Sequence, residues 1–102
     1  MKTAGFTSFD DFYPYYLSEH ADPRNRLLHF VGTSLVIALA AASPLVDLRL
    51  LWLLPVAGYG FAWVGHFIVE KNRPATFRHP LWSLMGDFRM YADIWAGRVK
   101  LS

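Results

Sequence analysis

The chain has 102 residues, of which 54% are hydrophobic and only 18% are charged, and its formal net charge is +2. That net charge is too small, and the basic residues too scattered, to indicate a nucleic-acid partner, so none is expected. Because the chain contains no cysteine, it has neither disulfides nor a thiolate metal site, and any metal must be held by His, Asp or Glu. The length predicts one domain over residues 1–102, more apolar than an ordinary soluble domain.

The first predicted helix is short, aromatic and amphipathic and covers residues 9–20. Ser8, followed by two acidic residues, is typical of a helix start, although Pro14 leaves a later start near Tyr13 open. Such a helix suits a membrane interface. The residues before it contain no apolar core segment, so no signal peptide is predicted.

Two apolar runs follow, each close to the roughly 20 residues that cross a bilayer core. The first lies in a predicted helix over residues 23–46, with Asp22 as N-cap and Pro23 in its first turn. The second covers residues 50–70. The connection at 47–49 is too short for anything but an antiparallel hairpin, and the positive-inside rule places the opposite ends of both runs in the cytoplasm.

A polar loop over residues 71–80 leads to the last predicted helix, residues 81–99. Its apolar side chains trace one face and its charged side chains lie off that face, so we expect it to cover the bundle rather than to span. The predicted fold is an all-α integral membrane helical bundle, with two transmembrane helices in an antiparallel hairpin and flanking amphipathic helices. The alternative is a compact soluble four-helix bundle with unusually apolar helices.

All four histidines fall at one end of this architecture. His29 lies near the start of the first run and His66 near the end of the second, so an antiparallel hairpin places them at nearly the same depth. His20 precedes the first run and His79 follows the second. Because ionisable groups in or near a membrane are functional candidates, this convergence predicts a shared metal site.

Each histidine also has an ordinary explanation. His66 could be a core histidine satisfied by Glu70, four residues on, and His79 could be a solvated loop residue. Glu70 has two further roles open, as a ligand in a site suited to non-haem iron or as the partner of the far nitrogen of a ligating imidazole. Asp87 is a weaker candidate for the same roles, and its alternative is a solvated position on the last helix.

Small residues share helix faces with the two central histidines. Gly58 lies on the stripe of His66, and Gly32 and Thr33 lie on that of His29. Since small residues permit close backbone approach, we expect the two helices to touch along the faces that carry the histidines.

Basic residues crowd the same end of the hairpin: Arg24, Arg26, Lys71, Arg73 and Arg78. They fit contact with lipid headgroups and a cytoplasmic orientation. They also fit capture of a carboxylate whose apolar tail enters the bilayer, and for that role we select Arg26, Lys71 and Arg73.

Several blocks of the sequence resemble the Mpo-type 2-hydroxy fatty acid dioxygenases. The first block comprises Tyr16–His20, Pro23–Arg26 and His29–Thr33; the second comprises Gly65–Phe67, Glu70–Phe77 and His79–Leu81; a third, shorter one is Gly86–Phe88. The length resembles that of the short bacterial members, which implies a bacterial inner membrane with the metal site on its cytoplasmic side.

The resemblance implies Fe(II)-dependent α-oxidation, in which a 2-hydroxy fatty acid reacts with O2 and loses one carbon. It also implies that His20, His29, His66 and His79 are the histidines of the iron site. Two alternatives remain: a non-catalytic membrane protein whose histidine cluster holds a structural metal or anionic lipid, and a structural histidine–carboxylate cluster in a hairpin that forms a homo-oligomer. A closed tetrahedral coordination shell around the metal would favour a structural role, and open coordination positions would favour a catalytic role.

Overall fold

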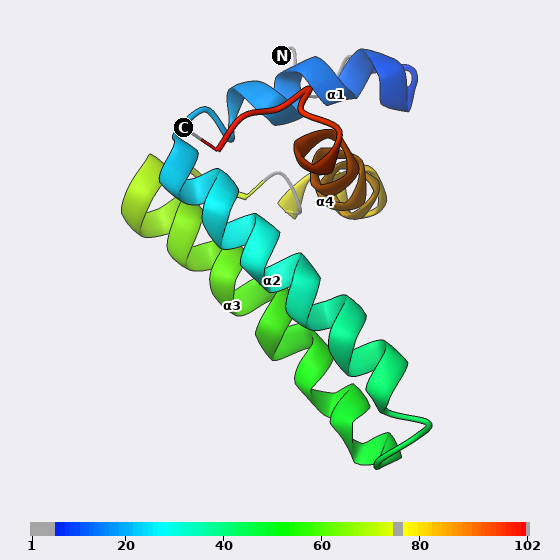
Figure 1. The fold of residues 1–102 in the computed structure, drawn as a ribbon. Coiled ribbons are helices and arrows are strands. Elements are labelled where there is room, and N and C mark those ends of the chain that lie inside the picture. The colour runs from blue at the N-terminus through cyan, green and yellow to red at the C-terminus, as the bar shows by residue number, and fades with distance from the viewer. Residues whose placement is uncertain (1–5, 75–76, 102) are drawn as a thin grey trace.

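The computed structural model describes residues 6–74 and 77–101, and all regular structure in these ranges is helical. The elements are α1 (Phe9–Ser18), α2 (Pro23–Ala42), η2 (Leu48–Leu53), α3 (Leu54–Val64), η3 (Gly65–Glu70) and α4 (Pro80–Trp95). Figure 1 shows α2 and α3 side by side in a long hairpin, with α1 and α4 gathered at the end remote from its connection. The expected all-α fold is therefore confirmed.

The second arm of the hairpin is one continuous helical segment, Leu48–Glu70, of 23 residues. It begins as a 3-10 helix in η2, continues as α3 and widens to a π-helix in η3. The two arms meet closely at Gly32, where an added Cβ would lie 3.0 Å from the carbonyl oxygen of Ala57. The helices thus touch along the faces that carry the histidines, as the small residues predicted.

The hairpin presents most of its apolar surface to the outside. Both arms are long and apolar enough to cross a membrane, and only 17% of the apolar window of each is buried inside the chain. Trp52 and Val56, for example, are 81% and 67% exposed. A core helix of a soluble protein would bury most of such a surface, so these faces lack a partner within the described part of the chain.

The buried core lies between α1 and α4 instead. Phe12, Tyr16 and Met90 are at most 1% exposed and form its centre. The two helices approach closely at Gly86, where an added Cβ would lie 2.8 Å from the ring of Tyr16. This core fixes α4 above the hairpin, at the level of the histidines.

Asp93 joins the first helix to the end of the last. The Tyr13 hydroxyl donates to its Oδ2 at 2.8 Å, and Arg98 Nε donates to its Oδ1 at 2.9 Å. Arg89 adds a longer contact of 3.3 Å. Burial alone would raise the pKa of this carboxyl, but the hydrogen bonds from Tyr13 and Arg98 hold the pKa below its usual value.

The capping residues expected from the sequence cap the starts of α1 and α2. Ser8 accepts the backbone N–H three residues on at 3.1 Å, so α1 begins at Phe9 and not near Tyr13. Asp22 accepts the N–H two residues on at 2.9 Å, as expected for an N-cap.

Three helix ends come earlier than the ranges expected from the sequence. α1 ends at Ser18 rather than near residue 20, because the chain turns at residues 19–20. α2 ends at Ala42 rather than near residue 46, because Pro44 has no N–H with which to continue the helix. α4 ends at Trp95 rather than near residue 99, because Gly97 takes a φ of +80° and turns the chain.

Candidate metal centre

Three of the four histidines converge on one point, and each comes from a different element. His20 lies in the turn after α1, His29 on α2 and His66 in η3, and all three are buried. His20 Nε2 lies 3.1 Å from His29 Nε2 and 2.9 Å from His66 Nε2. The three candidate ligand atoms lie within 4.8 Å of one another.

The hydrogen-bond partner of Nδ1, the other nitrogen of each ring, fixes the tautomer of that ring. The Nδ1 of His20 lies 2.6 Å from the Tyr16 carbonyl oxygen, and the Nδ1 of His29 lies 3.0 Å from the Asn25 carbonyl oxygen. Because a carbonyl oxygen can only accept, both Nδ1 atoms carry the proton and donate. Their Nε2 atoms therefore present bare lone pairs to the centre.

The third ring is held in the same tautomer by a side chain. His66 Nδ1 lies 2.7 Å from Asn72 Oδ1. The orientation of the Asn72 amide is set by a residue outside the histidine cluster, since its Nδ2 donates to the Glu19 carbonyl oxygen at 3.0 Å. The oxygen of the amide must therefore face His66, and His66 Nδ1 donates to it.

Three lone pairs that face one another without a proton between them repel unless a cation lies among them. A proton is a poor substitute for such a cation, because the pKa of His20 is well below its usual value. Burial is the main cause of this lowering, and the neighbouring His29 and His66 add to it. The cavity beside the three rings has a volume of about 10 Å³, close to the minimum of about 10–15 Å³ that one water requires. Neutral imidazoles whose far nitrogens donate to carbonyl oxygens are typical ligands of a first-row metal ion.

The local backbone explains how His66 reaches this centre. In η3 the helix widens, and the backbone N–H of Asn72 donates to the His66 carbonyl oxygen at 2.9 Å across six residues. Lys71 makes this closure possible by taking a left-handed φ of +59°. π-turns of this kind often occur at functional sites. The same turn brings the Asn72 side chain to the His66 ring.

Glu70 and Arg26 hold the segment that carries His20 instead of facing the metal centre. Glu70 Oε1 accepts the backbone N–H of Asp22 at 2.6 Å, and Glu70 is outside the three-histidine group. Arg26 Nε donates to the His20 carbonyl oxygen at 2.6 Å, and its Nη1 donates to the carbonyl oxygen of Lys100 at 3.2 Å. Both side chains thus anchor the turn between α1 and α2.

The structure does not bring His79 into the three-histidine group. Its ring lies 5.6 Å from Phe6, 5.2 Å from Phe12 and 5.7 Å from Trp82, measured between ring centroids. His79 immediately precedes α4 and packs on the aromatic core that orients this helix.

α4 contributes two polar groups to the small cavity. Asp87 accepts a hydrogen bond from the Tyr16 hydroxyl, and burial raises the pKa of its carboxyl to about 7. Ser83 is 3% exposed, and its Oγ has no hydrogen-bond partner among the described residues. The sequence indicates Asp87 as a candidate but not Ser83, although the position of Ser83 one helical turn before Asp87 is a usable signal.

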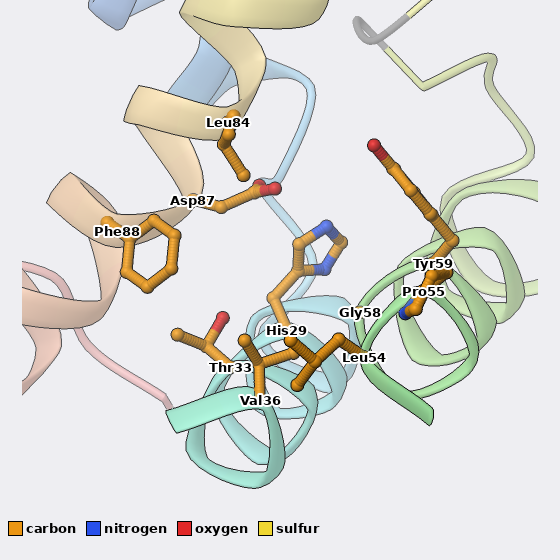
Figure 2. Close-up of a pocket in the computed structure, with 10 residues that line it drawn as sticks. All are labelled: His29, Thr33, Val36, Leu54, Pro55, Gly58, Tyr59, Leu84, Asp87 and Phe88. Carbon is orange, nitrogen blue, oxygen red and sulfur yellow. The ribbon is translucent and has the colours of Figure 1, made fainter. Parts of the chain in front are cut away.

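A second, larger cavity of about 230 Å³ opens beside the histidines. Figure 2 shows the Asp87 side chain reaching from α4 toward the His29 ring, with Tyr59 on the opposite wall. The wall is formed by His29, Thr33 and Val36 of α2, by Leu54, Pro55, Gly58 and Tyr59 of α3, and by Leu84, Asp87 and Phe88 of α4. Among the described residues no Arg or Lys lines either cavity, and Lys71 and Arg73 are exposed at the outer surface.

A family model described as 2-hydroxy-palmitic acid dioxygenase Mpo1-like matches residues 6–99, which is nearly the whole chain. No curated protein and no solved structure matches the chain significantly.

Proposed function

Since the chain belongs to the Mpo1-like family, described as 2-hydroxy-palmitic acid dioxygenases, we propose that it is an Fe(II)-dependent membrane dioxygenase that shortens a 2-hydroxy fatty acid by one carbon. One observation carries the metal part of this proposal. Three buried Nε2 atoms converge while all three Nδ1 protons are donated to carbonyl oxygens, which leaves three lone pairs directed at a point where a metal ion would satisfy all of them together.

His20, His29 and His66 would hold the iron. A three-histidine set leaves coordination positions open, in contrast to a closed structural shell. Bound Fe(II) would supply a site where O2 and the 2-hydroxy acid can meet and where the hydroxyl becomes more acidic. Glu70 has the role of holding the turn that carries His20, since its carboxylate is engaged by the Asp22 N–H.

The side chains around the histidines would orient the acid. Asp87 lines both cavities and is fixed by the Tyr16 hydroxyl, so it is placed to exchange a proton with the 2-hydroxyl group of the substrate. The Ser83 hydroxyl is free to donate to the carboxylate. Because neither cavity wall holds an Arg or Lys, Lys71 and Arg73 are assigned to the headgroup region, where they attract the anionic acid before it enters.

The proposed reaction balances without another reactant. A 2-hydroxy acid and O2 give the acid one carbon shorter, CO2 and water. The substrate loses four electrons and O2 accepts four, so that no external reductant is required. The protein therefore needs a metal, a place for the acid and access for O2, but no second redox cofactor.

The hairpin would cross the membrane. At about 1.5 Å per residue, α2 and the Leu48–Glu70 segment each reach the ~30 Å thickness of a hydrocarbon core. Their exposed apolar faces would contact lipid. The basic residues lie at the histidine end, so this end would face the cytoplasm. The membrane would be a bacterial inner membrane, as the resemblance to the short members of the family implies.

The decisive experiment measures metal and turnover together. Protein purified anaerobically and loaded with Fe(II) should hold one iron per chain and, with 2-hydroxyhexadecanoic acid, should consume one O2 for each pentadecanoic acid formed. His66→Ala should lose both the iron and the turnover. His79→Ala is the matched comparison and should keep the iron, because its ring lies outside the three-histidine group. Loss of iron from both variants would return His79 to the ligand set, and stoichiometric metal with no turnover would favour a non-catalytic role.

A further inference from the structure

The large cavity lies directly beside the small cavity at the three histidines. His29, Tyr59 and Asp87 line both the small cavity at the three imidazoles and the larger one. From His29 the large cavity follows α2 as far as Val36, seven residues on, which corresponds to about 10 Å along the helix axis. A molecule with its head at His29 could therefore extend along the hairpin within the large cavity.

The polarity of the walls changes along this path. The unpartnered Ser83 hydroxyl and the Asp87 carboxyl lie at the histidine end. Farther along, the wall is aliphatic and aromatic apart from Thr33, and Leu84 and Phe88 at the α4 side are 50% and 41% exposed. The cavity thus leads from polar groups to the apolar outer surface of the hairpin, where lipid and not water is the expected surrounding.

We infer that the cavity between α2, α3 and α4 is the binding site for the hydrocarbon chain of the acid, that the acid enters it sideways from the bilayer, and that Gly58 keeps the space for this chain open. The inference rests on the proposed function and adds to it the place of the tail, the direction of entry and a residue that determines specificity.

The volume sets how much of the chain is enclosed. A dry cavity of about 150 Å³ holds benzene, so about 230 Å³ holds on the order of nine carbon atoms. A longer chain therefore extends past the exposed side chains of Leu84 and Phe88 into the hydrocarbon of the membrane. The enclosed methylenes exchange lipid for the apolar cavity wall, so their contribution to binding depends on how well they pack against that wall, whereas methylenes that remain in lipid add little.

Gly58 is a position where this space can be reduced without disturbing the hairpin. An added Cβ would lie 3.5 Å from Val36 Cγ2, which is an ordinary van der Waals contact, and a longer side chain would continue into the cavity. Gly60 is on the same helix, has no atom within 4 Å of an added Cβ and does not line the cavity. The same substitution at Gly60 is therefore a matched control for helix propensity and added apolar surface.

The experiment compares Gly58→Leu with Gly60→Leu in the full-length, Fe(II)-loaded protein under anaerobic conditions in one detergent. Binding of 2-hydroxyhexadecanoic acid and of 2-hydroxybutanoic acid is titrated, and the iron content is measured alongside. Gly58→Leu should bind the sixteen-carbon acid at least tenfold more weakly than Gly60→Leu, should bind the four-carbon acid equally well and should keep its iron. Equal affinity of the two variants for the sixteen-carbon acid would overturn the inference.

A labelling experiment tests the same inference without a change in sequence. A 2-hydroxy fatty acid with a photoreactive diazirine near the middle of its chain should label peptides that contain Val36 or Gly58 in the wild-type protein. Labels confined to the outer surface of α1 would overturn the inference. Neither readout uses O2, so a protein that binds the acid in this cavity but does not turn it over would contradict the proposed function alone.

Discussion

Beside the three histidines, Gly65 of η3 faces Asn25 of α2 with no room for a side chain, and this makes Gly65→Ala an informative substitution. A Cβ at position 65 would lie 1.7 Å from Asn25 Oδ1 and 2.7 Å from Asn25 Cγ. Rotation of the amide would move Oδ1 but not Cγ. Asn25 is 0% exposed, so its side chain has no free space into which to turn.

The displacement required can be worked out from these distances. Real Cβ contacts are essentially never shorter than 3.0 Å, so the alanine must move away from Oδ1 by about 1.3 Å. The movement acts on two ligands, because His66 follows Gly65 directly and His29 Nδ1 donates to the carbonyl oxygen of Asn25. Metal–ligand distances tolerate only about 0.2 Å. We therefore expect Gly65→Ala to destabilise the fold by about 1–3 kcal/mol and to weaken metal binding by about 10–100-fold.

The assay is a competition for Fe(II) between the protein and a chelator, with thermal unfolding measured in parallel. Gly60→Ala is the control, since nothing lies within 4 Å of a Cβ at that position. The double variant Asn25→Ala/Gly65→Ala removes the obstructing amide and keeps the backbone carbonyl that His29 uses, so it should recover part of the affinity. Wild-type affinity in Gly65→Ala, or a double variant no better than Gly65→Ala, would refute the steric reasoning.

Three further predictions follow from named contacts. Asn72→Ala removes the acceptor that fixes the His66 tautomer and should weaken metal binding about 10–100-fold in the same competition assay, while a change below twofold would contradict this role. Ser83→Ala removes a buried hydroxyl that has no partner, so it should leave the unfolding temperature unchanged or raised while binding of the 2-hydroxy acid weakens; unchanged binding would show that the hydroxyl does not contact the acid. Asp93→Asn should cost about 1–3 kcal/mol at pH 7, measured by denaturant unfolding. Because the pKa of Asp93 is lowered in the folded state, its contribution is complete above the unfolded pKa of about 3.9 and is lost as the pH falls through the lower, folded value. The difference in stability between wild type and variant should therefore shrink as the pH falls below the unfolded pKa, and a difference that does not change with pH would exclude this linkage.

The parts of the structure that follow regular geometry were predictable from the sequence. Two apolar runs with a short connection predict an antiparallel hairpin, and the constant rise of a helix then places His29 and His66 at one depth. The small residues beside them predict the close contact that occurs at Gly32. Each of these predictions depends on the helical repeat or on the length of an apolar run. Both can be read from a single segment of the sequence without knowledge of the rest of the fold.

The parts that depend on loops and irregular turns were not predictable in the same way. His79 belongs to the same end of the molecule as the other histidines, but the direction of its side chain follows from packing against Phe12 and Trp82. The contact between Asn72 and His66 spans six residues, a spacing that an α-helix does not bring together, and it exists because the non-glycine Lys71 takes a left-handed conformation. Arg26, predicted to hold a carboxylate, donates to the carbonyl oxygens of His20 and Lys100, and a contact with a residue so far along the chain leaves no signal within one segment.

The tautomers of the three histidines leave the cluster able to bind a metal without any rearrangement of the rings. The acceptors that hold the Nδ1 protons come from α1, from α2 and from the turn after η3, and the last of these is tied back to α1 through the Glu19 carbonyl. Folding therefore aligns the three lone pairs, at the cost of burying polar nitrogens that no described group satisfies. That cost falls on the metal-free protein alone, so metal should stabilise the chain according to RT ln(1 + [metal]/Kd), and the gain should disappear in His66→Ala. A cluster kept only for structure would gain more from hydrogen bonds between the rings, which would require at least one Nδ1 to give up its carbonyl partner. At every ring the arrangement thus favours ligation of a metal over hydrogen bonds between the histidines.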